Sequence, residues 1–219
     1  MTASVSVKGE VHQECEVATP DRTETYKLLN KTKLTRDSYL LRFQVPVNRR
    51  ILVTDPTLPT CLKMDYPLGT DEVTGQHPIV LSESYSPVSH PSVEDYFDLI
   101  VKEYPARPGG GVGAFLCNLI IGESVTGAIK KHRLMHGSPE VQGRWEQVGL
   151  VAGGTGIAPL LQLVRIILAS PADASTRIHI LSINRLEEDI LMRHELDRLA
   201  VDYPNRVFVT YSLKRQQPW

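Results

Sequence analysis

The stretch Leu150-Val-Ala-Gly-Gly-Thr-Gly-Ile-Ala-Pro159 decides the fold of the second half of this chain. It starts within a continuous apolar run, Val148–Ala152, turns at three glycines and one threonine, and enters the helical pattern Ile157–Leu168. Glycine permits a positive φ and a close backbone approach, and Pro159 suits a first helical turn, where its missing N–H is no loss. The free N–H groups at such a helix start can bind a pyrophosphate. The pattern therefore indicates either a nucleotide-binding turn or a tight strand-to-helix connection.

Strands and helices alternate from this turn toward the C-terminus. We expect a second strand at Ile178–Ile183, a helix from about Glu187 to Ala200 and a third strand at Arg206–Leu213. One face of that helix is apolar and carries Met192, Leu196, Leu199 and Ala200. This β-α-β-α-β succession predicts a parallel sheet with right-handed crossovers. Three strands leave an open edge and an uncovered face, which predicts marginal stability or pairing of the edge.

The part of the chain before the glycine turn has a different texture, with short strand-like runs separated by Pro, Gly and Asp. The expected strands are Leu28–Leu34, Tyr39–Val45, His77–Leu81, Phe97–Tyr104 and Gly122–Ile129. Residues 48–74 contain prolines and no steady period, so we expect a long surface loop there. The fold class that follows is an antiparallel β-barrel and then an α/β parallel-sheet domain. The expected domain limits are 1–24 for a flexible tail, 25–143 for the barrel and 144–219 for the α/β domain.

Composition excludes several classes of protein. The 219 residues carry a formal net charge of -1, which does not favour nucleic acid or an anionic membrane as a partner. Three widely spaced cysteines without a CxxC pair make a disulfide scaffold or a zinc site improbable. The first residues show no signal peptide, and no apolar run is long enough to span a bilayer. We therefore expect no transmembrane segment and a cytoplasmic location.

The glycine stretch resembles the nicotinamide-nucleotide motif of the ferredoxin-NADP reductase superfamily, and residues 25–219 are most similar to its cytochrome-b5 reductase family. Further matching stretches follow in the family's order: Gly75-Gln-His77, Tyr85-Ser-Pro-Val-Ser89, Leu99-Ile-Val-Lys-Glu-Tyr104, Gly110-Gly111, Ile183-Asn-Arg185 and Glu188-Asp-Ile-Leu191. The resemblance implies a flavin-binding barrel followed by a nucleotide domain that stops part-way, since family members continue with further strands beyond the region of Trp219.

The function implied by the resemblance is transfer of a hydride from NADH to FAD and then of single electrons to an acceptor such as a b-type cytochrome. One alternative is a degenerate, non-catalytic module that binds a nucleotide or a protein partner. Another is a reductase domain cut from a larger redox chain such as nitrate reductase. The cofactors expected under the first reading are FAD and NADH.

The resemblance also assigns catalytic roles near the flavin. Tyr85 would pack on the flavin ring, and the hydroxyl of Ser86 would lie near the flavin nitrogen that accepts the hydride. His77 matches a histidine that the family uses in a hydrogen-bond relay to that hydroxyl. Without the resemblance, the simpler interpretation of His77 is an ordinary half-buried histidine in a strand.

The other flavin-binding residues are carried over in the same way. Lys102 and Tyr104 match residues that line the flavin, although a solvated strand face would explain Lys102 alone. Gly110 and Gly111 would open a short helix, Ala114–Leu119, whose start cradles the FAD pyrophosphate. The same family pattern places Pro87, Val88, Ser89 and Val101 among the cofactor-binding residues.

The nicotinamide nucleotide would be bound by Gly154, Thr155, Gly156 and Pro159. Asp189 matches an acidic position that in the family favours NADH over NADPH, because a carboxylate accepts a hydrogen bond from the ribose 2′-hydroxyl and repels a 2′-phosphate. An acidic residue at Asp189 is explained equally well by its favourable interaction with the partial positive charge at the start of a helix.

The chain departs from the family on the phosphate side of the flavin site. Glu83 stands where the family has an arginine that grips phosphate or flavin oxygens, and a glutamate repels a pyrophosphate. Val112-Gly-Ala114 replaces a Lys-x-Ser segment, and Gly127-Ala128 replaces a Gly-Pro. We therefore expect FAD binding that is weaker than is typical of the family or rearranged through Arg107 or Lys102. Cys117 lies in the flavin half and cannot replace the family's later Cys-Gly-Pro segment.

Overall fold

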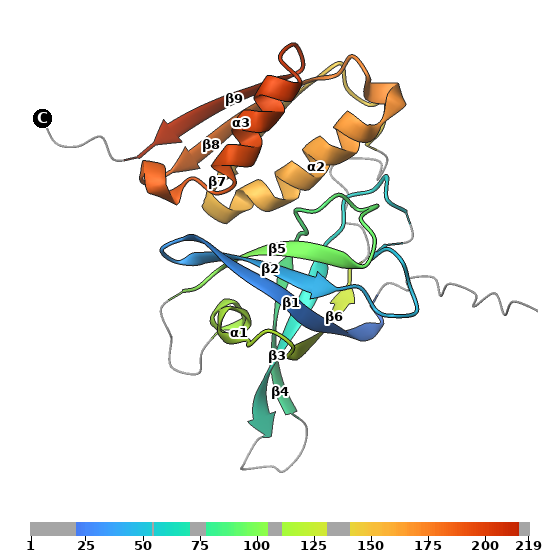
Figure 1. Ribbon diagram of the computed structural model, residues 1–219, viewed down its shortest axis with the longest axis vertical. Helices are drawn as coiled ribbons and strands as arrows, with labels where there is room; N and C mark the ends of the chain where they lie inside the picture. The colour runs from blue at the N-terminus through green and yellow to red at the C-terminus, as the bar shows by residue number, and fades with distance from the viewer. Residues whose placement is uncertain (1–20, 54, 71–77, 105–110, 131–140, 215–219) are drawn as a thin grey trace, which may run out of the picture.

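The computed structural model describes residues 21–53, 55–70, 78–104, 111–130 and 141–214. These residues form a six-stranded antiparallel sheet and a three-stranded parallel sheet, which lie in two separate bodies (Figure 1). The antiparallel body occupies the lower part of Figure 1 and the parallel sheet with its helices the upper part. The two-part architecture expected from the sequence is confirmed.

The lower body is a flavin-barrel-like sheet with the strand order β4-β3-β6-β1-β2-β5. Its strands are β1 (Thr23–Thr35), β2 (Ser38–Gln44), β3 (Leu62–Thr70), β4 (Pro78–Tyr85), β5 (Tyr96–Lys102) and β6 (Ser124–Ile129). The long strand β1 pairs with β6 through its first half and with β2 through its second, with irregularities in its register with β2. Because β1 belongs to both pairings, it bends the sheet toward closure.

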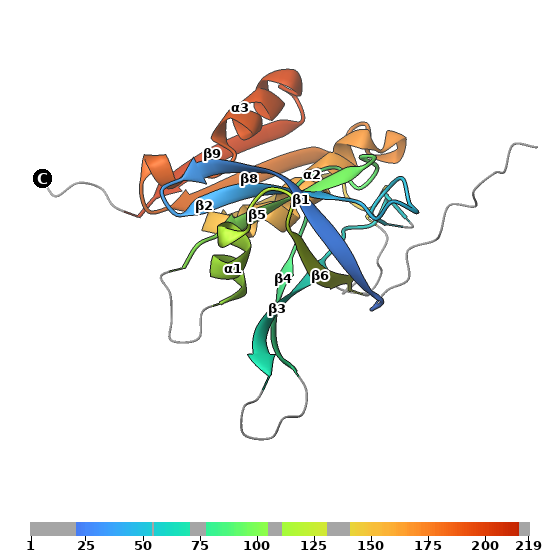
Figure 2. The same cartoon turned by 60° about the horizontal axis from the view of Figure 1, so that its bottom comes forward.

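Strand β3 lies inside the segment that the sequence predicted to be a loop, so that prediction was wrong. Leu62 and Met64 point into the core and are fully buried, while Lys63 between them is exposed. The alternation of Leu62, Met64 and Tyr66 covers only five residues before Pro67, after which the register with β4 shifts, and so brief a period-2 pattern escapes detection. Figure 2 shows that the β3–β4 hairpin extends away from the rest of the barrel. Strand β1 also starts at Thr23, within the expected tail.

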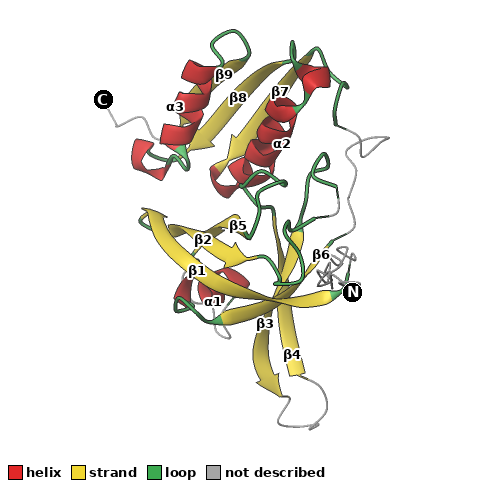
Figure 3. Ribbon diagram, turned by 45° about the vertical axis from the view of Figure 1, so that its right-hand side comes forward, coloured by secondary structure: helices red, strands yellow, loops and turns green. Residues whose placement is uncertain are grey.

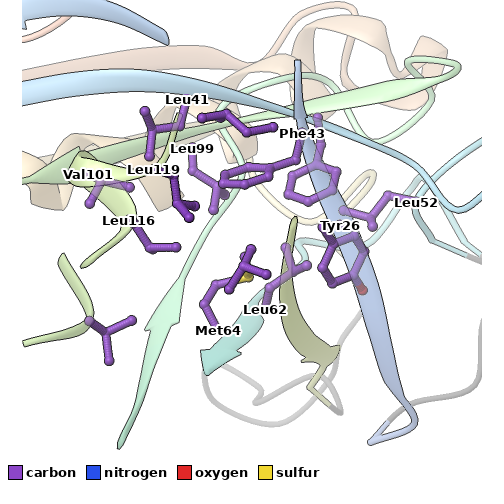
Figure 4. Packing of buried hydrophobic residues seen from close by; sticks show 14 of the residues in the cluster. Tyr26, Leu41, Phe43, Leu52, Leu62, Met64, Leu99, Val101, Leu116 and Leu119 are labelled. Atoms are coloured by element: carbon purple, nitrogen blue, oxygen red, sulfur yellow. The ribbon is translucent and has the colours of Figure 1, made fainter. Parts of the chain in front are cut away.

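The barrel core is built from aromatic and aliphatic side chains of β1, β2, β3 and β5 (Figure 4). The rings of Tyr26 and Phe97 meet edge to face with centroids 5.2 Å apart, and Phe43 stacks on Phe97 at 5.7 Å. Helix α1 (Val112–Asn118) adds the fully buried Leu116 to the same cluster. The helix is thereby fixed against β5, beside the expected flavin motif.

The upper body contains β7 (Gln147–Gly153), α2 (Ile157–Ala169), β8 (Arg177–Asn184), α3 (Arg193–Asp202) and β9 (Val207–Leu213), with short 3₁₀ turns at Gly154–Gly156, Pro171–Asp173 and Glu187–Asp189. The strands are parallel in the order β7-β8-β9, and both helices lie on one face (Figure 3). Side chains such as Val151 and Phe208 on the other face are exposed. The parallel sheet with one open face is the arrangement that the sequence predicted.

The expected helix from Glu187 to Ala200 is interrupted, which corrects the sequence prediction. A 3₁₀ turn ends at Asp189, and α3 starts only at Arg193. Between them the backbone of Met192 is left-handed, with φ of 56°. Ile190 and Leu191 are both buried, so this break lets two neighbouring apolar side chains enter the core, which a continuous helix would separate by about 100°.

Helix α2 joins the two bodies. Gln162, buried on α2, accepts a hydrogen bond of 2.6 Å from the backbone N–H of Thr60 in the barrel. Ile100 of β5 and Val88 pack with α2 in one apolar cluster. No helix within the described segments is both long enough and apolar enough to cross a bilayer.

Candidate functional site

The glycine turn between β7 and α2 leaves open space above its backbone. Gly154 has φ of +52°, a conformation that favours glycine, and it lies in the 3₁₀ turn that leads into α2. A Cβ atom built on Gly153, Gly154 or Gly156 would meet no protein atom within 4 Å. Packing therefore does not explain these glycines, and the start of α2 is open to the close approach of a ligand.

The expected flavin motif sits at the end of β4, with Tyr85 as its last residue and Ser86 next. The Tyr85 hydroxyl donates a 2.9 Å hydrogen bond to Glu83 Oε2. Burial, followed by this hydrogen bond and the Glu83 charge, raises the pKa of Tyr85 well above its usual range. Glu83 thus holds the tyrosine hydroxyl directly.

Helix α1 approaches this motif through a glycine. A Cβ on Gly113 would lie 2.6 Å from the backbone oxygen of Lys102 and 3.6 Å from the Tyr85 hydroxyl. The 2.6 Å contact is with a backbone oxygen, which could move away only if strand β5 shifted. Only glycine at this position therefore lets α1 lie so close to β5 and β4. The Val112-Gly-Ala114 segment therefore keeps the one residue on which this packing depends.

A cavity of about 270 Å³ brings the flavin motif and the glycine turn together. Tyr85, Ser86 and Lys102 line it from the barrel, and Thr155 and Pro159 line it from the turn and α2. These segments lie far apart in the sequence. The structure thus brings together most of the residues expected to bind the flavin ring and the nicotinamide end of the nucleotide.

A second cavity of about 460 Å³ adjoins the first, since Lys102, Tyr104 and Thr155 line both. Its remaining lining comes from the two bodies: Thr35, Asp37 and Ser38 from the barrel, and Gly153, Gly154, Ile183, Asn184, Arg185, Asp189, Leu191 and Lys214 from the nucleotide half. We refer to these two adjoining cavities as the interdomain cleft.

A cluster of charges crosses the cleft. Asp37, in the turn between β1 and β2, accepts from Lys102 Nζ at 2.9 Å and lies 3.7 Å from Arg185 Nη2. Arg185 Nε lies 3.5 Å from Asp189, and Arg36 Nε lies 4.0 Å from both carboxylates. Burial alone would raise the pKa of the Asp37 carboxyl, but the hydrogen bond and charge of Lys102, together with hydrogen bonds from Ser38 and Thr35, hold that pKa below its usual range.

Asp189 does not lie in the first turn of α3, so compensation of charge at the start of that helix does not explain its position. It lies in a 3₁₀ turn, and α3 begins four residues later at Arg193. Its side chain is 11% exposed, and its Oδ2 atom is buried without a hydrogen-bond partner. The same Oδ2 atom lies 3.5 Å from Arg185 Nε, so the carboxylate is ion-paired within the cavity that it lines.

Comparison with known proteins agrees with this geometry. Residues 25–130 match the family model "Oxidoreductase FAD-binding domain", and residues 150–219 match "Oxidoreductase NAD-binding domain". The chain is 30% identical over 197 residues to NADH-cytochrome b5 reductase 1 of Mycosarcoma maydis, an alignment that covers 90% of this chain and 55% of that protein. The chain is homologous to the NADH-cytochrome b5 reductases.

Further relatives of this reductase homologue include domains of larger proteins. It is 32% identical over 209 residues to nitrate reductase [NADH] of Spinacia oleracea, covering 88% of this chain and 21% of that protein. The crystal structure of the cytochrome b5 reductase domain of Ulva prolifera nitrate reductase matches with a TM-score of 0.74 and 28% identity, covering 92% of this chain and 78% of that one. The chain spans 55% and 59% of the lengths of two NADH-cytochrome b5 reductases.

The cleft fits a nicotinamide dinucleotide. The turn at Gly154 offers a cradle that side chains would fill, and Asp189 offers a carboxylate whose Oδ2 atom accepts no hydrogen bond, although it is ion-paired with Arg185. Arg185 and Lys214 line the same cavity and carry charge opposite to that of a pyrophosphate. Recognition of phosphate, of a ribose hydroxyl and of a flat ring is therefore available within one cleft.

The fit to a flavin is good for the ring and poorer for the phosphates. Tyr85 and Tyr104 give flat apolar surfaces and Ser86 a hydroxyl beside them, which suits an aromatic ring system with polar edges. Glu83 lines the same cavity with a carboxylate. The Lys102 ammonium is ion-paired with Asp37. The structure therefore does not support the expectation that Lys102 binds the FAD phosphates in place of the family's arginine.

Several expected cofactor-binding residues have buried side chains that do not line the cleft. Val101 lies in the barrel core and Val88 in the cluster beneath α2. Pro87 forms a β-bridge with Leu99, and the hydroxyl of Ser89 accepts from the backbone N–H of a neighbouring strand residue. Their side chains support the motif from beneath, and any ligand contact would come from their backbone.

Other expected positions are not in the cleft or lie outside the described residues. Gly111 precedes α1, and a Cβ there would meet nothing within 4 Å. The Cys117 thiol is buried in the barrel core, which raises its pKa to about 12, so it is inert there. His77, Gly110 and Arg107 lie outside the described residues.

The turn Thr35-Arg-Asp-Ser38 is a part of the cleft that sequence reasoning missed. Its position follows from strand pairing, because Ser38 lies opposite Lys102 in the register of β2 and β5. A polar turn with adjacent opposite charges is an ordinary surface feature. Only pairing across more than 60 residues and docking of the second body show that it faces Arg185.

Proposed function

We propose that this chain is the flavin- and nicotinamide-binding part of an NADH-dependent oxidoreductase. It would use FAD and pass electrons singly to a haem protein such as a b-type cytochrome. The observation that carries the proposal is the 270 Å³ cavity in which Tyr85 and Ser86 face Thr155 and Pro159. A bound flavin supplies the chemistry by accepting a hydride and releasing electrons one at a time. The reaction would take place in the cytoplasm.

The residues of the chain contribute binding, orientation and exclusion of water. Tyr85 presents an aromatic surface for ring packing, and Ser86 presents a hydroxyl to the polar edge of the ring. Thr155 and the backbone N–H groups of the turn hold the nicotinamide nucleotide at the start of α2. The two bodies together close the cleft, so both are required to bring two flat rings into contact.

Replacement of Ser86 by alanine tests the proposed role of its hydroxyl. We expect NADH-dependent ferricyanide reduction, measured with saturating FAD, to fall roughly 10- to 100-fold, because a hydrogen bond to a group that gains charge is lost. Ser82→Ala serves as the control and should leave the rate unchanged, because Ser82 lies in β4 just before the motif and donates to Asp65 away from the cleft. Wild-type activity no greater than that of free FAD would contradict the enzymatic proposal itself.

A degenerate module that binds only the nicotinamide nucleotide is the second candidate. The hydrogen bond between Tyr85 and Glu83 favours it, because it places a carboxylate in the flavin cavity. Calorimetric titration of NADH and of FAD, each alone, separates the candidates. Binding of NADH without FAD supports the module, and binding of both supports the oxidoreductase.

Replacement of Glu83 by arginine is expected to tighten FAD binding about tenfold. The change removes a repulsive charge and adds a phosphate-binding group, and its effect is moderate because the position is exposed. Quenching of flavin fluorescence on titration measures the affinity, and Glu83→Gln should give an intermediate value. Glu94→Arg makes the same charge change on an exposed part of the barrel surface outside the cleft. Equal gains for Glu83→Arg and Glu94→Arg would show that only net charge matters.

A further inference from the structure

Two carboxylates, one from each body, line the 460 Å³ cavity. Asp37 comes from the barrel and Asp189 from the nucleotide half. Both contact the guanidinium of Arg185, at 3.7 Å and 3.5 Å. The Arg185 charge is therefore shared between an acceptor in its own domain and one in the other.

Asp37 is held in a defined orientation. Its Oδ1 accepts from the hydroxyls of Thr35 at 3.3 Å and Ser38 at 3.2 Å, and its Oδ2 accepts from Lys102. The carboxylate is 26% exposed and faces the cavity that it lines. It is ionised at neutral pH, as its lowered pKa requires. The barrel thus presents an oriented, ionised carboxylate, paired with Lys102, to whatever occupies the nucleotide half of the cleft.

We propose that Asp37 is a specificity-determining residue that makes the cleft select a nicotinamide dinucleotide without a 2′-phosphate. This inference rests on the proposed function, since it assumes that the cleft holds such a dinucleotide. Asp37 acts in two ways. Its charge repels an additional dianionic group, and it engages the Arg185 guanidinium that would otherwise pair with that group. Selection is then made by both domains and not by Asp189 alone.

Replacement of Asp37 by asparagine removes the charge and keeps the shape. The amide oxygen can still accept from Ser38 and Thr35, whereas Arg185 loses one of its two carboxylates. We expect the affinity for NADP⁺ to rise about five- to tenfold and that for NAD⁺ to change by less than about twofold. A purely structural role would change both affinities equally.

The test is calorimetric titration of the full chain with NAD⁺ and with NADP⁺, with FAD present at a fixed concentration. Glu94→Gln is the matched control, since it removes a carboxylate paired with Arg50 on the barrel surface, outside the cleft. Arg185→Gln, added to Asp37→Asn, should abolish most of the gain for NADP⁺. A thermal unfolding curve for each variant verifies that it is folded.

A rise in NADP⁺ affinity confined to Asp37→Asn supports the proposal. An NADP⁺ affinity that matches the control, or equal changes for both nucleotides, overturns it while leaving the proposed function intact. A gain that persists when Arg185 is also replaced overturns the part assigned to Arg185. Failure of the unmodified chain to bind either nucleotide would instead overturn the proposed function, and this inference with it.

Discussion

Replacing Gly154 by valine is expected to weaken NAD⁺ binding about 100-fold or more. The backbone of Gly154 has φ of +52°, which a β-branched residue adopts only with strain. Its missing Cβ leaves free space at the start of α2, and a valine side chain would fill the volume that the pyrophosphate needs. Calorimetry with NAD⁺ measures the loss directly, without any requirement for bound flavin.

Gly122 provides the matched control for this substitution. It lies in the turn before β6, has φ of +99° and has no atom within 4 Å of a Cβ built on it. Gly122→Val therefore imposes comparable or greater backbone strain at a position that does not line the interdomain cleft. We expect it to lower the free energy of unfolding and to leave the NAD⁺ affinity intact. Similar losses of affinity in both variants would refute the role assigned to the glycine turn.

Replacing Glu24 by alanine is expected to lower the free energy of unfolding by about 3–5 kcal/mol, the usual cost of breaking a buried ion pair. Glu24 pairs with Arg49, whose side chain is only 3% exposed, and accepts from the Tyr26 hydroxyl at 3.1 Å. Its removal leaves a buried guanidinium without its carboxylate and a buried phenol without its acceptor. Burial, and after it the Glu24 charge, raises the pKa of Tyr26 above its usual range, so the phenol stays protonated.

The ion pair between Glu94 and Arg50 is the control for Glu24. Its atoms lie 2.7 Å apart, but its side chains are 50% and 73% exposed. Glu94→Ala is therefore expected to cost less than about 1 kcal/mol. Urea unfolding of the two variants, followed by circular dichroism, gives the comparison. Equal costs would show that burial of the Arg49 pair is not what stabilises the barrel.

The fold could be predicted where a long periodic pattern has one structural meaning. The apolar run before Gly153, the glycines and the helical pattern of α2 were all correctly placed by sequence. Prediction failed where the periodic pattern was short, and where burial of side chains in the core imposed a backbone conformation that differs from the one the pattern predicts. The alternating pattern of strand β3 ends after Tyr66 because Pro67 follows it. The left-handed backbone of Met192 divides a segment whose apolar residues otherwise suit a single helix. In both places the long-range contacts of the core decide the local structure.

The sequence by itself determined that a strand, a glycine turn and a helix follow one another in the second half of the chain. These are local features, since φ preferences and periodicity act between residues that are close along the chain. Only the tertiary structure decided that Asp37 and Arg185 meet, because that contact depends on the register of β2 with β5 and on the docking of α2 against the barrel. Interactions between residues almost 150 positions apart leave no periodic trace in the chain, and the selectivity we assign to the cleft is of this kind.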